Sequence, residues 1–153
     1  ITIRPATASD AAIIADFNSA LAHETEGKRL NPPTILAGVQ ALLADAHHGR
    51  YFVAEFEGRV VGQLMHTREW SDWRNGEIWW LQSVYVHPEY RRRGVFRQLM
   101  RHIADLARTT PGIVGLRLYM AHDNLAARKT YESCGFAEGG YVVLERMLGQ
   151  TGG

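Results

Sequence analysis

The spacing of apolar residues near the start of the chain predicts a strand and then two helices. Residues 2–4 alternate as in a strand, and a Ser9-Asp10 pair offers a helix cap. One helix face is then formed by apolar residues at helical spacing, Ile13, Ile14, Phe17 and Leu21. A polar stretch at residues 23–31 and the pair Pro32-Pro33 break this pattern. Residues 35–43 then predict a second amphipathic helix that ends near Gly49.

The middle of the chain reads as three strands. Residues 51–56 and 60–67 are rich in strand-forming side chains, and the Glu57-Gly58 pair between them is typical of a tight hairpin turn. Residues 70–76 read as a loop dense in aromatic and polar groups. Residues 77–87 then predict a long strand, which Pro88 ends because proline cannot donate to a strand ladder.

The last third of the chain predicts two helices and two strands. A helix begins at Gly94 and stops before Pro111, and residues 113–120 form an apolar strand. Asp123 or Asn124 caps a short helix that ends at Gly135, and residues 141–148 form a final strand. The order of elements predicts an α/β (α+β) fold, with a mixed sheet covered by helices on both faces.

Composition limits what such a fold can bind. The 153 residues fit a single domain over residues 1–153, and the formal charge of +1 gives no field that would recruit nucleic acid or an anionic membrane. The single cysteine, Cys134, excludes an internal disulfide and favours a reducing compartment. No apolar run approaches the roughly 20 residues that cross a bilayer, so we expect a cytoplasmic protein without a membrane anchor.

A strand feeds a helix through a basic, glycine-containing segment at residues 91–97. The first turn of a helix has unpaired backbone N–H groups and a partial positive charge, so it can bind a phosphate or pyrophosphate. Gly94 lets the backbone approach such a group closely, and the arginines add charge-assisted hydrogen bonds. A solvated basic face or an RNA contact through residues 91–101 are the alternatives.

A second segment, residues 124–136, indicates which anion residues 91–97 bind. Together the two segments resemble the GNAT superfamily of acyl-CoA N-acyltransferases, whose pyrophosphate loop runs Arg/Gln-x-x-Gly-x-Gly/Ala. A later helix in that family runs Asn-x-x-Ala-x-x-x-Tyr, followed by Gly-Phe. Arg91 and Gly94 match the first motif, and the second is matched at Asn124, Ala127, Tyr131, Gly135 and Phe136.

The resemblance implies a GNAT-like fold and an acetyl-CoA-dependent N-acetyltransferase. The sheet would be mixed and mostly antiparallel, with six to seven strands and about four helices. The main chain of Val84, Tyr85 and Val86 would pair with the pantetheine arm. The pyrophosphate would be held by the loop residues Arg91, Arg92, Arg93, Gly94, Val95, Phe96 and Arg97. Asn124 would also contact the cofactor, and Tyr131 would act as the general acid toward the departing thiolate.

Phe96 departs from the family pattern, because glycine or alanine usually stands at its position. Its amide still donates a hydrogen bond, but the ring must turn into the protein or lie along the cofactor. We therefore expect a displaced loop or a preference for a particular acyl group.

The acceptor amine must lose a proton before it attacks, so a carboxylate or a bound water is needed as a base. Glu24 and Glu26 lie in the polar break between the first two helices, where this family usually builds acceptor recognition, and Glu26 is the tentative base. Glu77 is less favoured. Strict alternation places it on the face of Trp79 and Leu81, opposite the face that carries Trp80, Gln82 and Val84.

Aromatic residues in the 70–76 loop are candidates for binding an organic cation. Trp70 and Trp73, with Asp72 beside them, suit the acceptor side of the site. Trp79 and Trp80 fit a core or a dimer contact equally well. His47, His48 and His66 have no partners at metal-ligand spacing, so no metal is expected.

These patterns predict direct transfer of an acetyl group from acetyl-CoA to a primary amine on a small molecule or a peptide. A binding module that holds acyl-CoA without efficient chemistry is the alternative, suggested by Phe96 and by the lack of an obvious base. A homodimer through strand edges stays open, because residues 141–148 are apolar.

Overall fold

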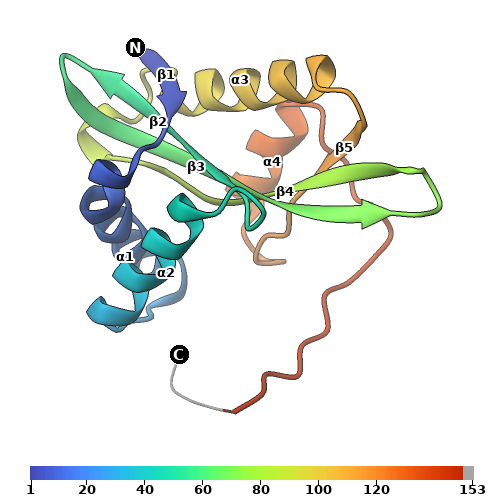
Figure 1. Ribbon diagram of the computed structural model, residues 1–153, viewed down its shortest axis with the longest axis horizontal. Coiled ribbons are helices and arrows are strands. Elements are labelled where there is room, and N and C mark those ends of the chain that lie inside the picture. The colour runs from blue at the N-terminus through green and yellow to red at the C-terminus, as the bar shows by residue number, and fades with distance from the viewer. Residues whose placement is uncertain (150–153) are drawn as a thin grey trace. The chain divides into compact units, whose positions relative to one another are not determined.

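The computed structural model describes residues 1–149 and divides into two compact units, Ile1–Arg117 and the chain from Leu118 onward (Figure 1). The single domain expected over the whole chain stays a prediction. The elements of the first unit are β1 (Thr2–Pro5), α1 (Ala11–Glu26), α2 (Pro32–Ala44), β2 (Arg50–Phe56), β3 (Arg59–Ser71), β4 (Gly76–Val86), α3 (Val95–Thr109) and β5 (Ile113–Arg117). Short 3-10 turns occur at Ala8–Asp10 and Pro88–Tyr90.

The sheet has the order β1-β2-β3-β4-β5, antiparallel up to β4 and parallel between β4 and β5. The predicted mixed, mostly antiparallel sheet with flanking helices is confirmed, but the expected six to seven strands are five among the described residues. The Glu57-Gly58 turn is also confirmed. These two residues join β2 to β3, and both have positive φ, 51° at Glu57 and 75° at Gly58.

A bulge in β4 changes which side chains share a face. Gln63 pairs with Tyr85 and Met65 pairs with Gln82, so β4 has one extra residue there, and Ser83 takes a positive φ of 52°. The extra residue reverses the alternation, so Tyr85 lies on the face of Gln82. The predicted grouping of Val84 with Gln82 was therefore wrong.

The two faces of the sheet are covered by different helices. On one face, Tyr51, Val53 and Met65 join a buried cluster with Ala11, Ile14 and Ala15 of α1 and Val39 of α2. On the other face, α3 packs on β2 and β3. A Cβ at Gly62 of β3 would lie 2.9 Å from Val95 Cγ1, so glycine lets the first turn of α3 approach the sheet.

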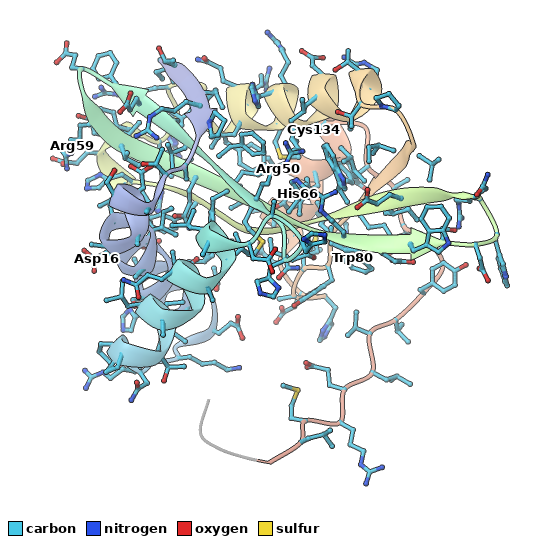
Figure 2. The ribbon with its side chains drawn as sticks, viewed as in Figure 1. Asp16, Arg50, Arg59, His66, Trp80 and Cys134 are labelled. Carbon is cyan, nitrogen blue, oxygen red and sulfur yellow. The ribbon has the colours of Figure 1, made fainter. Side chains whose placement is uncertain are left out.

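Under α3, a buried histidine completes the core. The His66 ring stacks on Trp79 with centroids 4.2 Å apart. Arg50 Nε donates to His66 Nε2 at 3.3 Å, and both of these residues are labelled in Figure 2. Burial lowers the pKa of His66 to about 4, so this ring is neutral at physiological pH. His66 and Trp79 are therefore structural core residues.

The helix ends differ from the expected boundaries. α1 continues through the polar stretch to Glu26 and ends at Gly27, whose φ of 63° is left-handed. Glu24 and Glu26 therefore lie on the last turn of a helix and not in a loop. α2 begins at Pro32, because proline fits the first helical turn and the Asn31 side chain accepts from Thr34 N. In the turn before α1, the Asp10 side chain accepts a hydrogen bond from Thr7 N at 2.7 Å.

The 70–76 loop was predicted too long. β3 runs to Ser71 and β4 starts at Gly76, so residues 72–75 form the tip of a hairpin. A Cβ at Gly76 would lie 2.3 Å from Val114 Cγ1 of β5, which explains a glycine at this point.

The second unit contains α4 (Leu125–Ser133), capped by Asn124 Oδ1, which accepts from Ala127 N at 3.0 Å. Gly135 follows the helix with φ 95°, as expected. The predicted strand at residues 141–148 was wrong, because no strand occurs between Leu118 and residue 149. Its apolar side chains are exposed, Leu144 by 89%, and an apolar segment without a partner strand does not form a ladder.

Among residues 1–149, no helix combines the length and the apolar character needed to cross a bilayer.

Candidate active site

A cavity of about 450 Å³ opens between the end of β4 and the start of α3, and we call it the β4–α3 pocket. Its residues are Leu21, Glu24, Thr25, Val84, Tyr85, Val86, Tyr90, Arg91, Arg92, Gly94, Val95, Phe96 and Arg97. Of the residues predicted to bind the cofactor, only Arg93 and Asn124 are not part of this lining. Strand and helix therefore bring together groups that sequence alone could only place in order along the chain.

The backbone at the start of α3 is shaped for an anion. Gly94 has φ 82° and precedes Val95, and Gln98 N donates a helical hydrogen bond to Gly94 O. The amides of Val95, Phe96 and Arg97 thus belong to the first turn, where helix N–H groups lack internal partners. Arg92 has a φ of 64°, which is uncommon outside glycine and concentrates at functional sites.

β4 offers main-chain groups beside the same pocket. β5 pairs with β4 only from Glu77 to Trp80, so among the described residues the parallel ladder ends before Leu81. The bulge at Ser83 follows, and Val84 and Val86 line the pocket. An extended ligand chain can add to such an open edge through backbone hydrogen bonds.

Three side chains that line the β4–α3 pocket form one polar cluster. Tyr85 Oη donates to Glu24 Oε2 at 2.5 Å, and Arg91 Nη2 donates to Glu24 Oε1 at 2.7 Å. Arg91 Nε also donates to Val86 O at 2.9 Å. The Tyr85 hydrogen bond and the Arg91 charge hold the pKa of Glu24 below its usual range. Burial, and then Glu24, raise the pKa of Tyr85 to about 12.

The arginines of residues 91–97 differ in their contacts. Arg91 is engaged by Glu24 and Val86, and the Arg93 guanidinium lies over the Tyr90 ring at 5.3 Å. Arg92 and Arg97 are exposed and line the pocket. Phe96 is half-buried and lines the same pocket, so its ring forms part of the wall.

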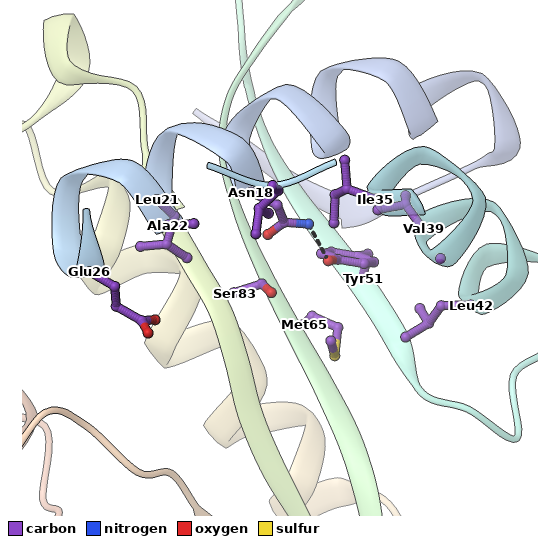
Figure 3. A pocket seen from close by; sticks show the side chains of 12 residues that line it. Asn18, Leu21, Ala22, Glu26, Ile35, Val39, Leu42, Tyr51, Met65 and Ser83 are labelled. Atoms are coloured by element: carbon purple, nitrogen blue, oxygen red, sulfur yellow. Dashed lines mark hydrogen bonds between the residues drawn. The ribbon is translucent and has the colours of Figure 1, made fainter. Parts of the chain in front are cut away.

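A second cavity, of about 320 Å³, lies between α1, α2 and the sheet, and we call it the α1–α2 pocket (Figure 3). Its residues are Asn18, Leu21, Ala22, Glu26, Leu30, Ile35, Gly38, Val39, Leu42, Tyr51, Met65 and Ser83. Leu21 lines both pockets, and β4 passes from Ser83 in one to Val84 in the other. The two cavities are therefore neighbours across one turn of α1.

A hydrogen-bonded network forms the floor of the α1–α2 pocket. Asn18 Nδ2 donates to Tyr51 Oη at 2.9 Å (Figure 3). Gln63 Nε2 donates to Asn18 Oδ1 and to the Ser83 carbonyl, both at 3.1 Å. Burial raises the pKa of Tyr51, so its phenol stays neutral. The network links α1, β2, β3 and the bulge of β4.

Glu26 is the one carboxylate among the residues that line the α1–α2 pocket. Its side chain is 57% exposed and lies 3.2 Å from Lys28 Nζ. Glu24, two residues earlier and so about half a helical turn away, lines the β4–α3 pocket instead. The two glutamates that the sequence grouped together therefore face different cavities.

The predicted aromatic acceptor residues lie elsewhere. Trp70 is 64% exposed near the end of β3, Trp73 is 88% exposed at the hairpin tip, and Asp72 lies beside it. They line neither pocket. Trp80 donates to Glu69 at 2.5 Å. A role of Trp70, Asp72 and Trp73 in acceptor binding stays a prediction.

Asn124 and Tyr131 belong to the second unit. The Asn124 side chain caps α4, as described above. Tyr131 lies edge-on to Phe136, with ring centroids 5.9 Å apart, and burial raises the pKa of its phenol. A phenol with a raised pKa holds its proton at neutral pH, which a general acid requires.

Sequence reasoning missed the residues of the polar floor. Asn18, Tyr51 and Gln63 carry no motif. A polar residue at a buried strand position, as at Gln63 between Gly62 and Leu64, was the available signal, because buried polar groups need partners. Among residues 1–149, no three His, Cys, Asp or Glu side chains gather as a metal site would require.

The model of the family described as the Acetyltransferase (GNAT) family matches residues 16–136. The chain is 30% identical over 154 residues to the phosphinothricin N-acetyltransferase of Streptomyces viridochromogenes, covering 92% of this chain and 82% of that protein. A possible acetyltransferase from Clostridium difficile 630 has a TM-score of 0.93 at 45% identity, over 97% of this chain and 98% of that chain. The structure of a predicted acetyltransferase with acetyl-CoA from Clostridium acetobutylicum shares the fold, with a TM-score of 0.76 at 16% identity over 94% of this chain and 95% of that chain.

Proposed function

This chain belongs to the GNAT acetyltransferase family and is an acetyl-CoA-dependent N-acetyltransferase, and we propose that it transfers the acetyl group directly to a primary amine in the α1–α2 pocket. The donor would occupy the β4–α3 pocket. The observation that carries the proposal is that the two pockets adjoin at Leu21 and at the Ser83 bulge. An amine in one cavity would thereby lie beside a thioester in the other.

The residues of the β4–α3 pocket fit coenzyme A. The first-turn amides of α3 suit its pyrophosphate, with Arg92 and Arg97 supplying positive charge. The open edge of β4 after Trp80 suits the pantetheine arm, which carries amide groups. When bound, acetyl-CoA supplies the activated acyl group. The protein's part is to hold that group beside the amine.

Glu26 is the proposed base, because it is the carboxylate on the acceptor cavity. It would take the proton that the amine must lose, directly or through a water. The amine nitrogen forms a bond to the acetyl carbonyl carbon while the carbon–sulfur bond breaks. The proposed role of Tyr131 is to donate its phenolic proton to the sulfur.

Titration calorimetry with acetyl-CoA and a thiol-release assay with amines together test the proposal. Gly94→Ala should weaken acetyl-CoA binding by about tenfold, because alanine is strained at φ 82° by roughly 1–2 kcal/mol. Gly58→Ala is the matched control. It places alanine at a similar φ, 75°, in the β2–β3 turn, and should leave binding unchanged.

The outcomes separate enzyme from binding module. Binding with amine-dependent thiol release supports transfer. Binding without release for any amine would support the acyl-CoA-binding module instead. Equal losses of affinity in Gly94→Ala and Gly58→Ala would remove the β4–α3 pocket from donor binding.

A further inference from the structure

We infer that the acceptor is a small primary amine whose substituent is apolar and carries no anionic group. The inference rests on the proposed function, since it assumes that the acceptor occupies the α1–α2 pocket. It adds the substrate class, which neither the family nor the fold specifies.

The walls of the α1–α2 pocket are mostly hydrocarbon. Seven of the lining side chains are aliphatic or thioether, namely Leu21, Ala22, Leu30, Ile35, Val39, Leu42 and Met65. Val39 and Met65 are 3% and 9% exposed, so they form a fixed wall that belongs to the core. An apolar substituent gains about 25 cal/mol for each Å² that it buries against such a wall.

No residue that lines this pocket carries a positive charge. A carboxylate or phosphate on the acceptor would need a cation or several N–H donors in place of water. The side-chain amides of the floor already donate within the network, Asn18 Nδ2 to Tyr51 Oη and Gln63 Nε2 to Asn18 Oδ1. Lys28 does not line the pocket, and its Nζ is already paired with Glu26 Oε1 at 3.2 Å. An anionic acceptor would thus be desolvated without an unpaired cation in the pocket, whereas the ammonium or amine itself can face Glu26.

The size of the cavity favours a small molecule. About 320 Å³ lies at the lower end of the roughly 300–1,000 Å³ of ligand pockets. Gly38 of α2 keeps part of this space open, since a Cβ built there meets no atom within 4 Å. A side chain longer than alanine at this position would fill the cavity from the helix side.

Pairs of amines that differ by one carboxylate test the inference directly. Isoamylamine is compared with leucine, and phenylethylamine with phenylalanine, by thiol release from acetyl-CoA under the same conditions. We expect kcat/KM to be at least about a hundredfold higher for each amine than for its amino acid, as for a site that leaves a buried polar group unpaired. A leucine-initiated peptide amide should also be a poor acceptor.

Gly38→Leu tests whether the amine binds in the α1–α2 pocket. It should lower kcat/KM for isoamylamine by about tenfold or more, because it occupies the space of the substituent, and leave acetyl-CoA binding unchanged. Ala37→Leu is the matched control, since Ala37 is exposed on the same helix and does not line the pocket.

Each outcome has a definite meaning. Preference for leucine, phenylalanine or the peptide would overturn the substrate class and leave acetyl transfer standing. Equal kcat/KM in wild type and Gly38→Leu would show that the acceptor binds elsewhere, and would overturn the inference. Thiol release with none of the amines would contradict the proposed function itself, and the substrate class would fall with it.

Discussion

Arg91 Nη2 lies 2.7 Å from Glu24 Oε1, which joins the loop before α3 to the last turn of α1. That turn borders both cavities, because Leu21 lines each of them. The ion pair therefore ties the geometry of the β4–α3 pocket to the helix that forms a wall of the α1–α2 pocket.

Glu24→Gln and Arg91→Gln should be non-additive in their effect on the dissociation constant of acetyl-CoA. Each change removes the same pair, so the double variant should bind about as the weaker single variant does. The pair is half exposed, so a coupling free energy of about 0.2–1 kcal/mol is expected from a double-mutant cycle by calorimetry. Simple addition of the two effects would show that the pair does not act as a unit.

The ion pair between Arg4 and Asp10 predicts that the stability of the fold depends on pH. Arg4 lies 2.8 Å from Asp10 and holds the pKa of that carboxyl below its ordinary 3.8. A lowered folded-state pKa means that the stabilisation is present above pH 3.8 and is lost as the pH falls through the lower value. Acid destabilisation below pH 3.8 should therefore be smaller in Arg4→Gln than in wild type.

At neutral pH, Arg4→Gln should lower the free energy of unfolding by about 3 kcal/mol, because the Asp10 side chain is only 8% exposed and loses its charged partner. Urea unfolding at several pH values measures both effects. A difference between wild type and Arg4→Gln that stays constant down to pH 2 would rule out the linkage.

The contact of β3 with α3 predicts that alanine destabilises the fold at Gly62 of β3 but not at Gly115 of β5. Gly62→Ala should cost about 1–3 kcal/mol, because the new methyl lies 2.9 Å from Val95 Cγ1. Gly115→Ala, in β5, meets no atom within 4 Å and should be neutral or mildly stabilising. Urea midpoints compare the two, and equal midpoints would contradict the close packing of α3 on β3.

Much of the fold follows from local pattern. The β2–β3 turn, the β4 strand and the start of α3 were predicted because glycine, proline and alternation act over a few residues. Glu24 and Glu26 were grouped because sequence shows only their spacing. The helix that continues to Glu26 separates them, and its end depends on Gly27 in a left-handed conformation.

The remaining errors share a long-range cause. The bulge at Ser83 depends on pairing with β3, so strict alternation misplaced Val84. The strand expected at residues 141–148 has the right composition, but strand formation requires a partner edge. The polar floor joins Asn18 to residues 33 and 45 positions away, and no local signal encodes such contacts.

Tyr131→Phe tests the proposed proton donor. Loss of the hydroxyl should lower kcat by about a hundredfold, the smaller end of the range for general acid catalysis, with acetyl-CoA affinity nearly unchanged. Tyr141→Phe is the control, because that side chain is 75% exposed. Turnover of Tyr131→Phe equal to wild type across the pH range would remove Tyr131 from the acid role.

The location of the donor site is tested most directly by backbone amide chemical shifts during a titration with coenzyme A. The largest changes are predicted at Val95, Phe96 and Arg97 and along residues 84–86, while residues 72–75 of the hairpin tip should not move. Unchanged amides at the start of α3 in saturated protein, with the largest shifts elsewhere, would contradict the assignment of the β4–α3 pocket to acetyl-CoA.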